Sequence, residues 1–169
     1  MSTSTDMHRK EAPKTVSIAI ITVSTSRGLR QDKSGEWISS AATLRGHTVL
    51  TREVVPDNRQ RIQDAIHAVA TKDKPQILIV TGGTGIGSTD VTIEAIRPLF
   101  SKELTAFSCL FAQLSYHEIG SAALLSRATA GLIEDTVTFC LPGSLHACKL
   151  ALETLIFPEI GHLARHAGQ

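Results

Sequence analysis

The sequence has no long apolar run and little net charge, and each absence excludes a class of protein. Its hydrophobic stretches are far shorter than the roughly 20 residues of a membrane-spanning helix, so we expect neither a membrane protein nor a membrane partner. Residues 1–14 lack the apolar core of a secretory signal, and we expect a disordered tail on a cytoplasmic protein. The formal charge of +1 gives no electrostatic reason to expect nucleic acid as a partner.

The cysteines lack the spacing of a zinc site or a disulfide framework. There are three of them, Cys109, Cys140 and Cys148, with no C-x-x-C pair, and an odd count suits reduced thiols. His162 and His166 are spaced i, i+4, but no Glu completes an H-E-x-x-H motif. We therefore expect two surface histidines there and no resident zinc ion.

Common nucleotide-binding and hydrolase motifs are also absent. No Gly-Lys-Ser/Thr follows the glycines of residues 82–87, which excludes a Walker A loop, and Ser88 stands where the dinucleotide fingerprint has its third glycine. There is no G-x-S-x-G elbow, and Ser144 and His146 are too close in sequence to face each other on a helix. We expect neither a dinucleotide-dependent oxidoreductase nor a hydrolase with a Ser-His triad.

The stretch QILIVTGGTGIGSTDVTIE, residues 76–94, is the most informative part of the chain. Its apolar run, residues 77–80, is typical of a strand that is buried on both faces. The glycines that follow allow positive φ, and Thr89 or Asp90 is expected to cap the next helix. A strand, a glycine loop and a helix start predict an anion site of free N–H groups and helix dipole. The alternative is a flexible turn without a ligand.

The rest of the chain predicts one α/β domain over residues 15–169. Strands are expected at residues 16–23, 47–55, 77–80, 128–133 and 136–141, and helices at residues 36–44, after Asp57, after Asp90, at 107–116, at 121–126 and from Ser144 onward. The order β-α-β-α-β-α favours parallel strands with right-handed crossovers. Only Glu134 and Asp135 separate the last two strands, which predicts an antiparallel hairpin and hence a mixed sheet.

Polar chain breaks follow the expected parallel strands at residues 24–34, 57, 82–90 and 142–144. Because ligands bind at the carboxyl ends of strands in such sheets, we expect these breaks to share one rim. Backbone N–H groups and hydroxyls there suit phosphate oxygens, whereas Asp57 and Asp90 suit Mg²⁺ held together with phosphates. The alternative is that each carboxylate only serves a helix start, Asp57 in a capping box with Gln60 and Asp90 beside the helix dipole.

Taken together, these motifs resemble the MoaB/MogA family of molybdenum-cofactor biosynthesis proteins. The matching motifs are T-G-G-T-G at 81–85, D-V-T at 90–92, L-P-G-S at 141–144, D-K-S-G at 32–35, P-D-N at 56–58 and L-S-R-A at 125–128. The similarity covers the chain from about residue 16 to residue 163. The part after Leu104 is closer to the MoaB branch of the family.

The resemblance implies a three-layer α/β/α fold that binds molybdopterin and transfers AMP to its terminal phosphate from Mg-ATP. It implies Mg²⁺ as cofactor, ATP as co-substrate, self-association to a trimer or hexamer, and other enzymes of the pathway as partners. The family's functional aspartates match Asp57 and Asp90, which would serve catalysis and hold the metal. Residues expected to bind substrate or phosphate are Ser24, Asp32, Ser34, Gly82, Gly83, Thr84, Gly85, Thr92, Pro142, Gly143 and Ser144.

Two positions differ from the family pattern. Gly87-Ser88-Thr89 lacks the arginine that often precedes the second aspartate, and His146 stands where a lysine is common. Both changes remove positive charge from the proposed phosphate site, although Lys149 and Arg127 are available to compensate. They favour a second function, a non-catalytic molybdopterin binder or carrier. A third is an oligomeric interaction protein with a vestigial pocket.

Overall fold

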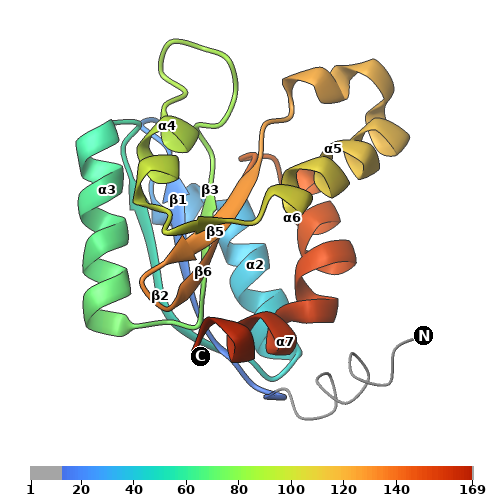
Figure 1. The fold of residues 1–169 in the computed structure, drawn as a ribbon. Helices are drawn as coiled ribbons and strands as arrows, with labels where there is room; N and C mark the ends of the chain where they lie inside the picture. The colour runs from blue at the N-terminus through green and yellow to red at the C-terminus, as the bar shows by residue number, and fades with distance from the viewer. Residues whose placement is uncertain (1–12, 169) are drawn as a thin grey trace.

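Six strands form a mixed sheet at the centre of the structure, a computed structural model that describes residues 13–168 (Figure 1). Across the sheet the strands are β2 (Thr48–Val55), β1 (Ser17–Val23), β3 (Ile77–Thr81), β6 (Thr136–Leu141), β5 (Thr129–Ile133) and β4 (Lys102–Glu103). The first four run parallel, and β5 is antiparallel to both of its neighbours. The predicted hairpin and the edge position of β2 are confirmed. The tail predicted for residues 1–14 lies outside the described residues except for its last two positions.

Helices cover both faces of the sheet, which makes the three-layer α/β/α fold. They are α2 (Lys33–Leu44), α3 (Arg59–Ala68), α4 (Thr92–Ile96), α5 (Thr105–Ile119), α6 (Leu145–Ala151) and α7 (Phe157–Ala167), with short turns at Leu29–Gln31, Val69–Asp73, Arg97–Leu99, Gly120–Leu125 and Leu152–Ile156. Among the described residues, no helix combines the length and the apolar character that crossing a bilayer requires.

The core has two halves because successive side chains of a strand point to opposite faces. On β1, Ile18 and Ile20 pack with α2, α5, α6 and α7, whereas Ala19 and Ile21 pack with α3 and α4. All five residues of β3 are buried. An unbroken run of β-branched and apolar residues therefore forms the centre of the sheet, and the glycine loop starts from a strand that is buried along its whole length.

Several predicted helix ends are wrong, and side-chain capping explains two of them. α2 begins at Lys33 rather than Glu36 because the buried Asp32 carboxylate accepts a hydrogen bond from the Gly35 N–H at 2.9 Å. The capping residue of α3 is Asn58, whose side chain accepts from the Arg61 N–H at 3.1 Å. The capping box predicted for Asp57 is therefore not formed.

One further capping expectation fails after β3. Neither Thr89 nor Asp90 caps α4, which begins at Thr92 with no side-chain cap. The helical stretch after Ser144 is divided near Pro158: α6 ends at Ala151, and α7 begins at Phe157 with Pro158 in its first turn, where the missing N–H of proline matters little. The apolar side chains of α5 are only partly covered: Phe111 is buried, whereas Leu110 is 48% exposed.

Candidate functional site

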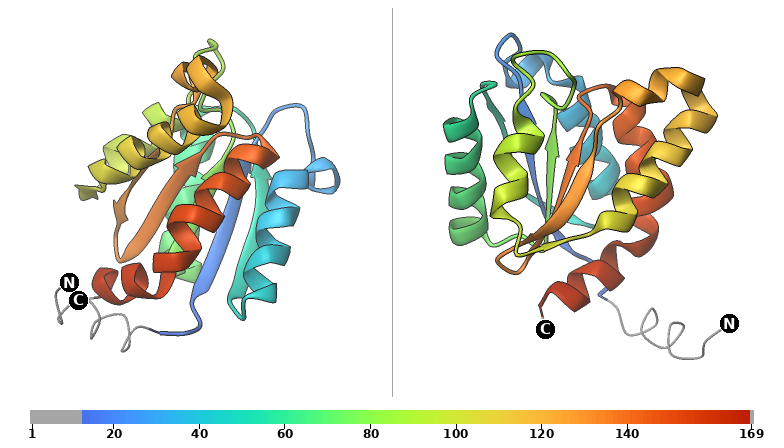
Figure 2. Two further views of the ribbon diagram at one scale, coloured as in Figure 1. Left: turned by 90° about the vertical axis from the view of Figure 1, so that its right-hand side faces the viewer. Right: turned by 45° about the horizontal axis from the view of Figure 1, so that its top comes forward.

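The chain breaks that follow the four parallel strands gather at one end of the sheet. The Ser24 N–H donates to the Val55 carbonyl at 2.8 Å, which joins the ends of β1 and β2. The Gly82 N–H donates to the Leu141 carbonyl at 3.1 Å, which joins the ends of β3 and β6. The right-hand view of Figure 2 brings this end forward and shows the loops after β1 and β3 together. The sequence-predicted rim is thus a single surface at the carboxyl ends of the strands.

The loop after β3 owes its shape to two glycines and to Thr92. Gly82 and Gly83 have φ of +99° and +61°, a region that side chains disfavour. The buried Thr92 hydroxyl donates to the Gly82 carbonyl at 2.8 Å, and its N–H donates to the Gly83 carbonyl at 2.9 Å. A hydroxyl predicted to contact phosphate is therefore engaged with the loop backbone, and Thr92 positions the loop.

Asp57 lies at one flank of this loop. Its Oδ2 accepts hydrogen bonds from the N–H and the hydroxyl of Thr25, at 2.7 and 2.8 Å. Its Oδ1 faces Gly83, where a Cβ atom would come within 2.9 Å of it. One carboxylate oxygen is thus anchored to the loop after β1, and the other lies beside the glycine loop.

Asp90 lies in the second half of the same loop. Its Oδ2 accepts from the Gly87 N–H at 2.8 Å and would lie 2.6 Å from a Cβ atom on Gly85. Arg127 holds the loop by donating from Nε to the Thr84 carbonyl at 2.8 Å. The Thr84 side chain itself is buried. The loop therefore carries a carboxylate on each flank, Asp57 near its start and Asp90 near its end.

Arg127 also contacts an acidic side chain, Glu94. The two side chains form an ion pair with an N···O distance of 2.7 Å. The hydrogen bond from Arg127 lowers the pKa of the Glu94 carboxyl, and the same bond raises the pKa of Arg127. Arg127 does reach the rim, but its charge is largely offset there.

The segment after β6 completes the rim. A Cβ atom on Gly143 would lie 3.0 Å from the Gly82 Cα, so the two loops are in contact. The Ser34 hydroxyl donates to the Gly143 carbonyl at 3.0 Å, and the Pro142 carbonyl accepts from the Thr81 hydroxyl at 2.9 Å. Ser144 caps α6 as predicted, since its hydroxyl accepts from the Ala147 N–H.

The predicted site residues thus fall into two groups. Exposed or half-buried positions at the rim are Asp57, Gly83, Gly85, Asp90, Pro142, Gly143 and Ser144, whereas Ser24 and Gly82 are buried at the ends of β1 and β3. Asp32, Ser34, Thr84 and Thr92 are buried beneath the rim, and Asp32 accepts from the Thr22 hydroxyl at 2.9 Å. The side chains of Asp32, Ser34 and Thr92 form hydrogen bonds to neighbouring protein groups.

Two rim residues escaped the sequence analysis, Thr25 and Arg27. The Ser24 hydroxyl accepts hydrogen bonds from both the N–H and the Nε of Arg27, at 3.2 and 3.4 Å. The polar cluster after the first strand was visible in the sequence only as a turn. The hydrogen bond between Thr25 and Asp57 joins residues 32 positions apart, and no local sequence pattern predicts it.

Comparison with known proteins agrees with the predicted resemblance. Residues 19–162 match the family described as "Probable molybdopterin binding domain". The chain belongs to this family. It is 46% identical over 159 residues to molybdenum cofactor biosynthesis protein B of Bacillus subtilis (strain 168), covering 94% of each chain. It is 43% identical over 166 residues to the molybdopterin adenylyltransferase of Pyrococcus furiosus, covering 95% of this chain and 96% of the relative.

The fold agrees as well. A crystal structure of molybdenum cofactor biosynthesis protein B superposes with a TM-score of 0.89 at 42% identity, covering 94% of this chain and 99% of the other. The relationship to MoaB and MogA proteins, predicted from short motifs, is confirmed over nearly the whole chain.

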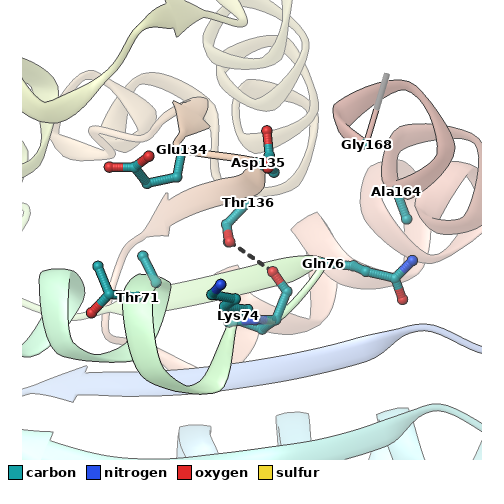
Figure 3. A pocket seen from close by; sticks show the side chains of 10 residues that line it. Thr71, Lys74, Gln76, Glu134, Asp135, Thr136, Ala164 and Gly168 are labelled. Carbon is teal, nitrogen blue, oxygen red and sulfur yellow. Dashed lines mark hydrogen bonds between the residues drawn. The ribbon is translucent and has the colours of Figure 1, made fainter.

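A separate cavity, shown in Figure 3, lies away from the rim. That cavity of about 530 Å³ lies at the amino ends of β3 and β6, where the Thr136 hydroxyl donates to the Pro75 carbonyl at 2.7 Å. Lys74, Gln76 and Asp135 also line it. A smaller cavity, of about 50 Å³, adjoins the rim and is lined in part by Ser144 and His146.

The rim suits a magnesium ion only in company with phosphates. Within residues 13–168 no three His, Cys, Asp or Glu side chains are grouped as a complete metal site. Mg²⁺ is commonly held by one or two carboxylates together with substrate phosphates and water. Asp57 and Asp90 fit that pattern, and the remaining ligands would come from a bound nucleotide.

Proposed function

We propose that this protein binds molybdopterin and transfers AMP to it from Mg-ATP during molybdenum-cofactor biosynthesis. The relatives described above support the pathway, and the name of the Pyrococcus furiosus relative supports the reaction. The observation that carries the proposal is the pair of carboxylates, Asp57 and Asp90, on the two flanks of a glycine loop at the carboxyl ends of the strands. The cytoplasm is the proposed compartment, which suits three unpaired cysteines.

The proposed reaction requires alignment more than a protein nucleophile. An oxygen of the molybdopterin phosphate forms a bond to the α-phosphorus of ATP, the bond from that phosphorus to its bridging oxygen breaks, and pyrophosphate leaves with the electron pair. Mg²⁺, when bound, would neutralise charge on the triphosphate. The contribution of the chain is to hold two anions in line, which makes the reaction effectively unimolecular.

Each rim residue has a proposed part in that alignment. Asp57 would use Oδ1, since its Oδ2 is held by Thr25, and Asp90 would act from the far side of the loop. The backbone of residues 82–85, with Gly143 and the Ser24 and Ser144 hydroxyls beside it, would contact phosphate oxygens. Asp32, Ser34, Thr84 and Thr92 would position these loops.

Self-association to a trimer or hexamer is part of the proposal. Large apolar side chains are exposed along α5 and the turn after it: Leu110, Tyr116, Ile119, Leu124 and Leu125. Patches of this kind commonly mark protein contacts. Other enzymes of the pathway are further proposed partners. Sedimentation analysis of the purified protein would measure the subunit number, and a monomer at micromolar concentration would contradict this part.

The decisive experiment measures AMP-molybdopterin and pyrophosphate after mixing the protein with molybdopterin and Mg-ATP. Asp90→Asn should lower turnover by at least 100-fold, because the carboxylate charge is removed while the shape is kept. Asp135→Asn, an exposed position at the opposite end of the sheet, serves as the control and should retain full activity. Full turnover by Asp90→Asn would refute the assignment of this site.

A second function has one specific observation in its favour. Arg127, which donates to the Thr84 carbonyl of the glycine loop, forms an ion pair with Glu94. A site with little net positive charge suits a non-catalytic molybdopterin carrier. Calorimetry separates the two functions: a carrier binds molybdopterin without metal-dependent ATP binding, whereas the transferase binds both ligands.

A further inference from the structure

We propose that Arg27 binds the acceptor phosphate of molybdopterin without the help of a metal ion, on the Gly143 side of the rim. The inference rests on the proposed function, and it assigns the two anionic substrates to different parts of one surface. It also names a cation that replaces the two positive charges that the sequence lacks at residues 87–89 and at His146.

The position of Arg27 comes from three contacts. Its N–H and its Nε both donate to the Ser24 hydroxyl, at 3.2 and 3.4 Å, which turns the side chain back over the end of β1. Its terminal nitrogen, Nη2, lies 3.9 Å from the place that a Cβ atom would take on Gly143. Gly143 in turn touches Gly82. The guanidinium therefore lies where the loops after β1, β3 and β6 meet.

Other basic side chains near the rim already have a partner. Arg127 pairs with Glu94 at 2.7 Å, Lys149 lies 5.5 Å from the centre of the Trp37 ring, and His146 lies 3.5 Å from the Glu118 carboxylate. Arg27 is exposed and forms no ion pair within the described part of the chain. Its full charge and several N–H donors thus remain for an anion from solution.

The distribution of charge decides which anion binds there. The carboxylates of Asp57 and Asp90 repel a bare phosphate and need a cation between them and the ligand, which suits the metal-bound triphosphate. Arg27 and the backbone at Gly143 offer positive charge and N–H donors directly, which suits a phosphate monoester without metal. A monoester seated at Arg27 would lie beside the glycine loop that is proposed to hold the triphosphate.

The test compares Arg27→Ala, Arg27→Lys and Arg30→Ala. Arg30 is an exposed arginine of the following turn and serves as the matched control for loss of one positive charge. Arg27→Ala should raise the KM for molybdopterin about 10- to 100-fold, the effect of losing a hydrogen bond to a charged group, and should leave the KM for Mg-ATP unchanged. Arg27→Lys should recover part of the loss, and Arg30→Ala should match the unsubstituted protein.

Calorimetry of molybdopterin binding gives a readout that does not need turnover. If the unsubstituted protein binds molybdopterin but makes no AMP-molybdopterin, the transferase proposal fails, and the dissociation constants still decide the role of Arg27. An unchanged affinity for molybdopterin in Arg27→Ala overturns the inference, as does a loss confined to Mg-ATP or an equal loss in Arg30→Ala. An unsubstituted protein that binds no molybdopterin overturns both proposals.

Discussion

Gly83→Ala probes the packing between the glycine loop, Thr92 and Asp57, and Gly46→Ala is its control. Both glycines have positive φ, +61° and +83° respectively. A Cβ atom on Gly46 would meet nothing within 4 Å, whereas one on Gly83 would overlap the Thr92 hydroxyl and approach Asp57 Oδ1 to 2.9 Å. The two variants therefore share the backbone cost of alanine and differ in what the new methyl group displaces.

The structure gives a magnitude for the difference. Alanine in the left-handed region costs about 1–2 kcal/mol, and both variants should lose that much free energy of unfolding. In Gly83→Ala the Thr92 hydroxyl must also move away from the Gly82 carbonyl, its hydrogen-bond acceptor at 2.8 Å. A buried hydroxyl without a partner costs about 1–3 kcal/mol, so Gly83→Ala should be less stable than Gly46→Ala by about that amount.

Urea denaturation at one protein concentration measures the stability difference, and the molybdopterin adenylylation assay measures activity. Displacement of Asp57 by about 1 Å should lower kcat/KM of Gly83→Ala roughly 100-fold, whereas Gly46→Ala should keep its activity. Equal stabilities and equal activities of the two variants would refute the packing described between the glycine loop, Thr92 and Asp57.

Three further predictions concern the framework around the rim. Ser144→Ala should lose about 1 kcal/mol of unfolding free energy in urea, because it removes the cap of α6, and an unchanged midpoint would contradict the cap. In the native protein a thiol reagent should modify Cys109 quickly and leave Cys140 and Cys148 protected, since burial raises the pKa of Cys148 to about 11. Burial also lowers the pKa of His47 below its ordinary 6.5, so the neutral ring is favoured in the folded state. The contribution of neutral His47 to the free energy of unfolding is therefore complete above pH 6.5 and declines as the pH falls below 6.5. His47→Gln should reduce this dependence of the free energy of unfolding on pH, measured by urea titrations at several pH values. An unchanged pH dependence would contradict the lowered pKa of His47.

Most of the sheet could be predicted because its strands are nearly continuous apolar runs. β1 and β3 are buried on both faces, so their composition alone distinguishes them from amphipathic helices. β4 escaped prediction because Lys102 and Glu103 are both exposed and polar, and only their pairing with β5 makes them a strand. Such a strand is defined by a distant partner rather than by its own residues.

The helix ends were harder to predict because several polar residues compete for each cap. For α3 we predicted Asp57 as the cap, although Asn58 follows it directly, and for α4 we predicted Thr89 or Asp90. In the structure the choice depends on tertiary contacts, since Thr25 holds Asp57 from a loop 32 residues away.

The meeting of the four chain breaks at one rim could be predicted, but the role of each side chain within the rim could not. Parallel strands place all their carboxyl ends at one edge, so four separate chain breaks had to meet whatever their side chains. Whether a given hydroxyl faces a ligand or the backbone depends on local packing. Thr92 and Ser34 were predicted to bind substrate or phosphate. In the structure their hydroxyls donate to the carbonyls of Gly82 and Gly143.

The failed capping prediction for Asp57 bears directly on function. A capping carboxylate accepts hydrogen bonds from the helix N–H groups and has less charge to offer a metal ion. Here Asn58 performs that task, and the hydrogen bonds to the Asp57 side chain both go to Oδ2. Oδ1 is left facing Gly83, at the flank of the glycine loop. Because the neutral Asn58 side chain caps α3, the Asp57 carboxylate does not bind the N–H groups of that helix. Its negative charge therefore remains available to the proposed Mg-ATP site.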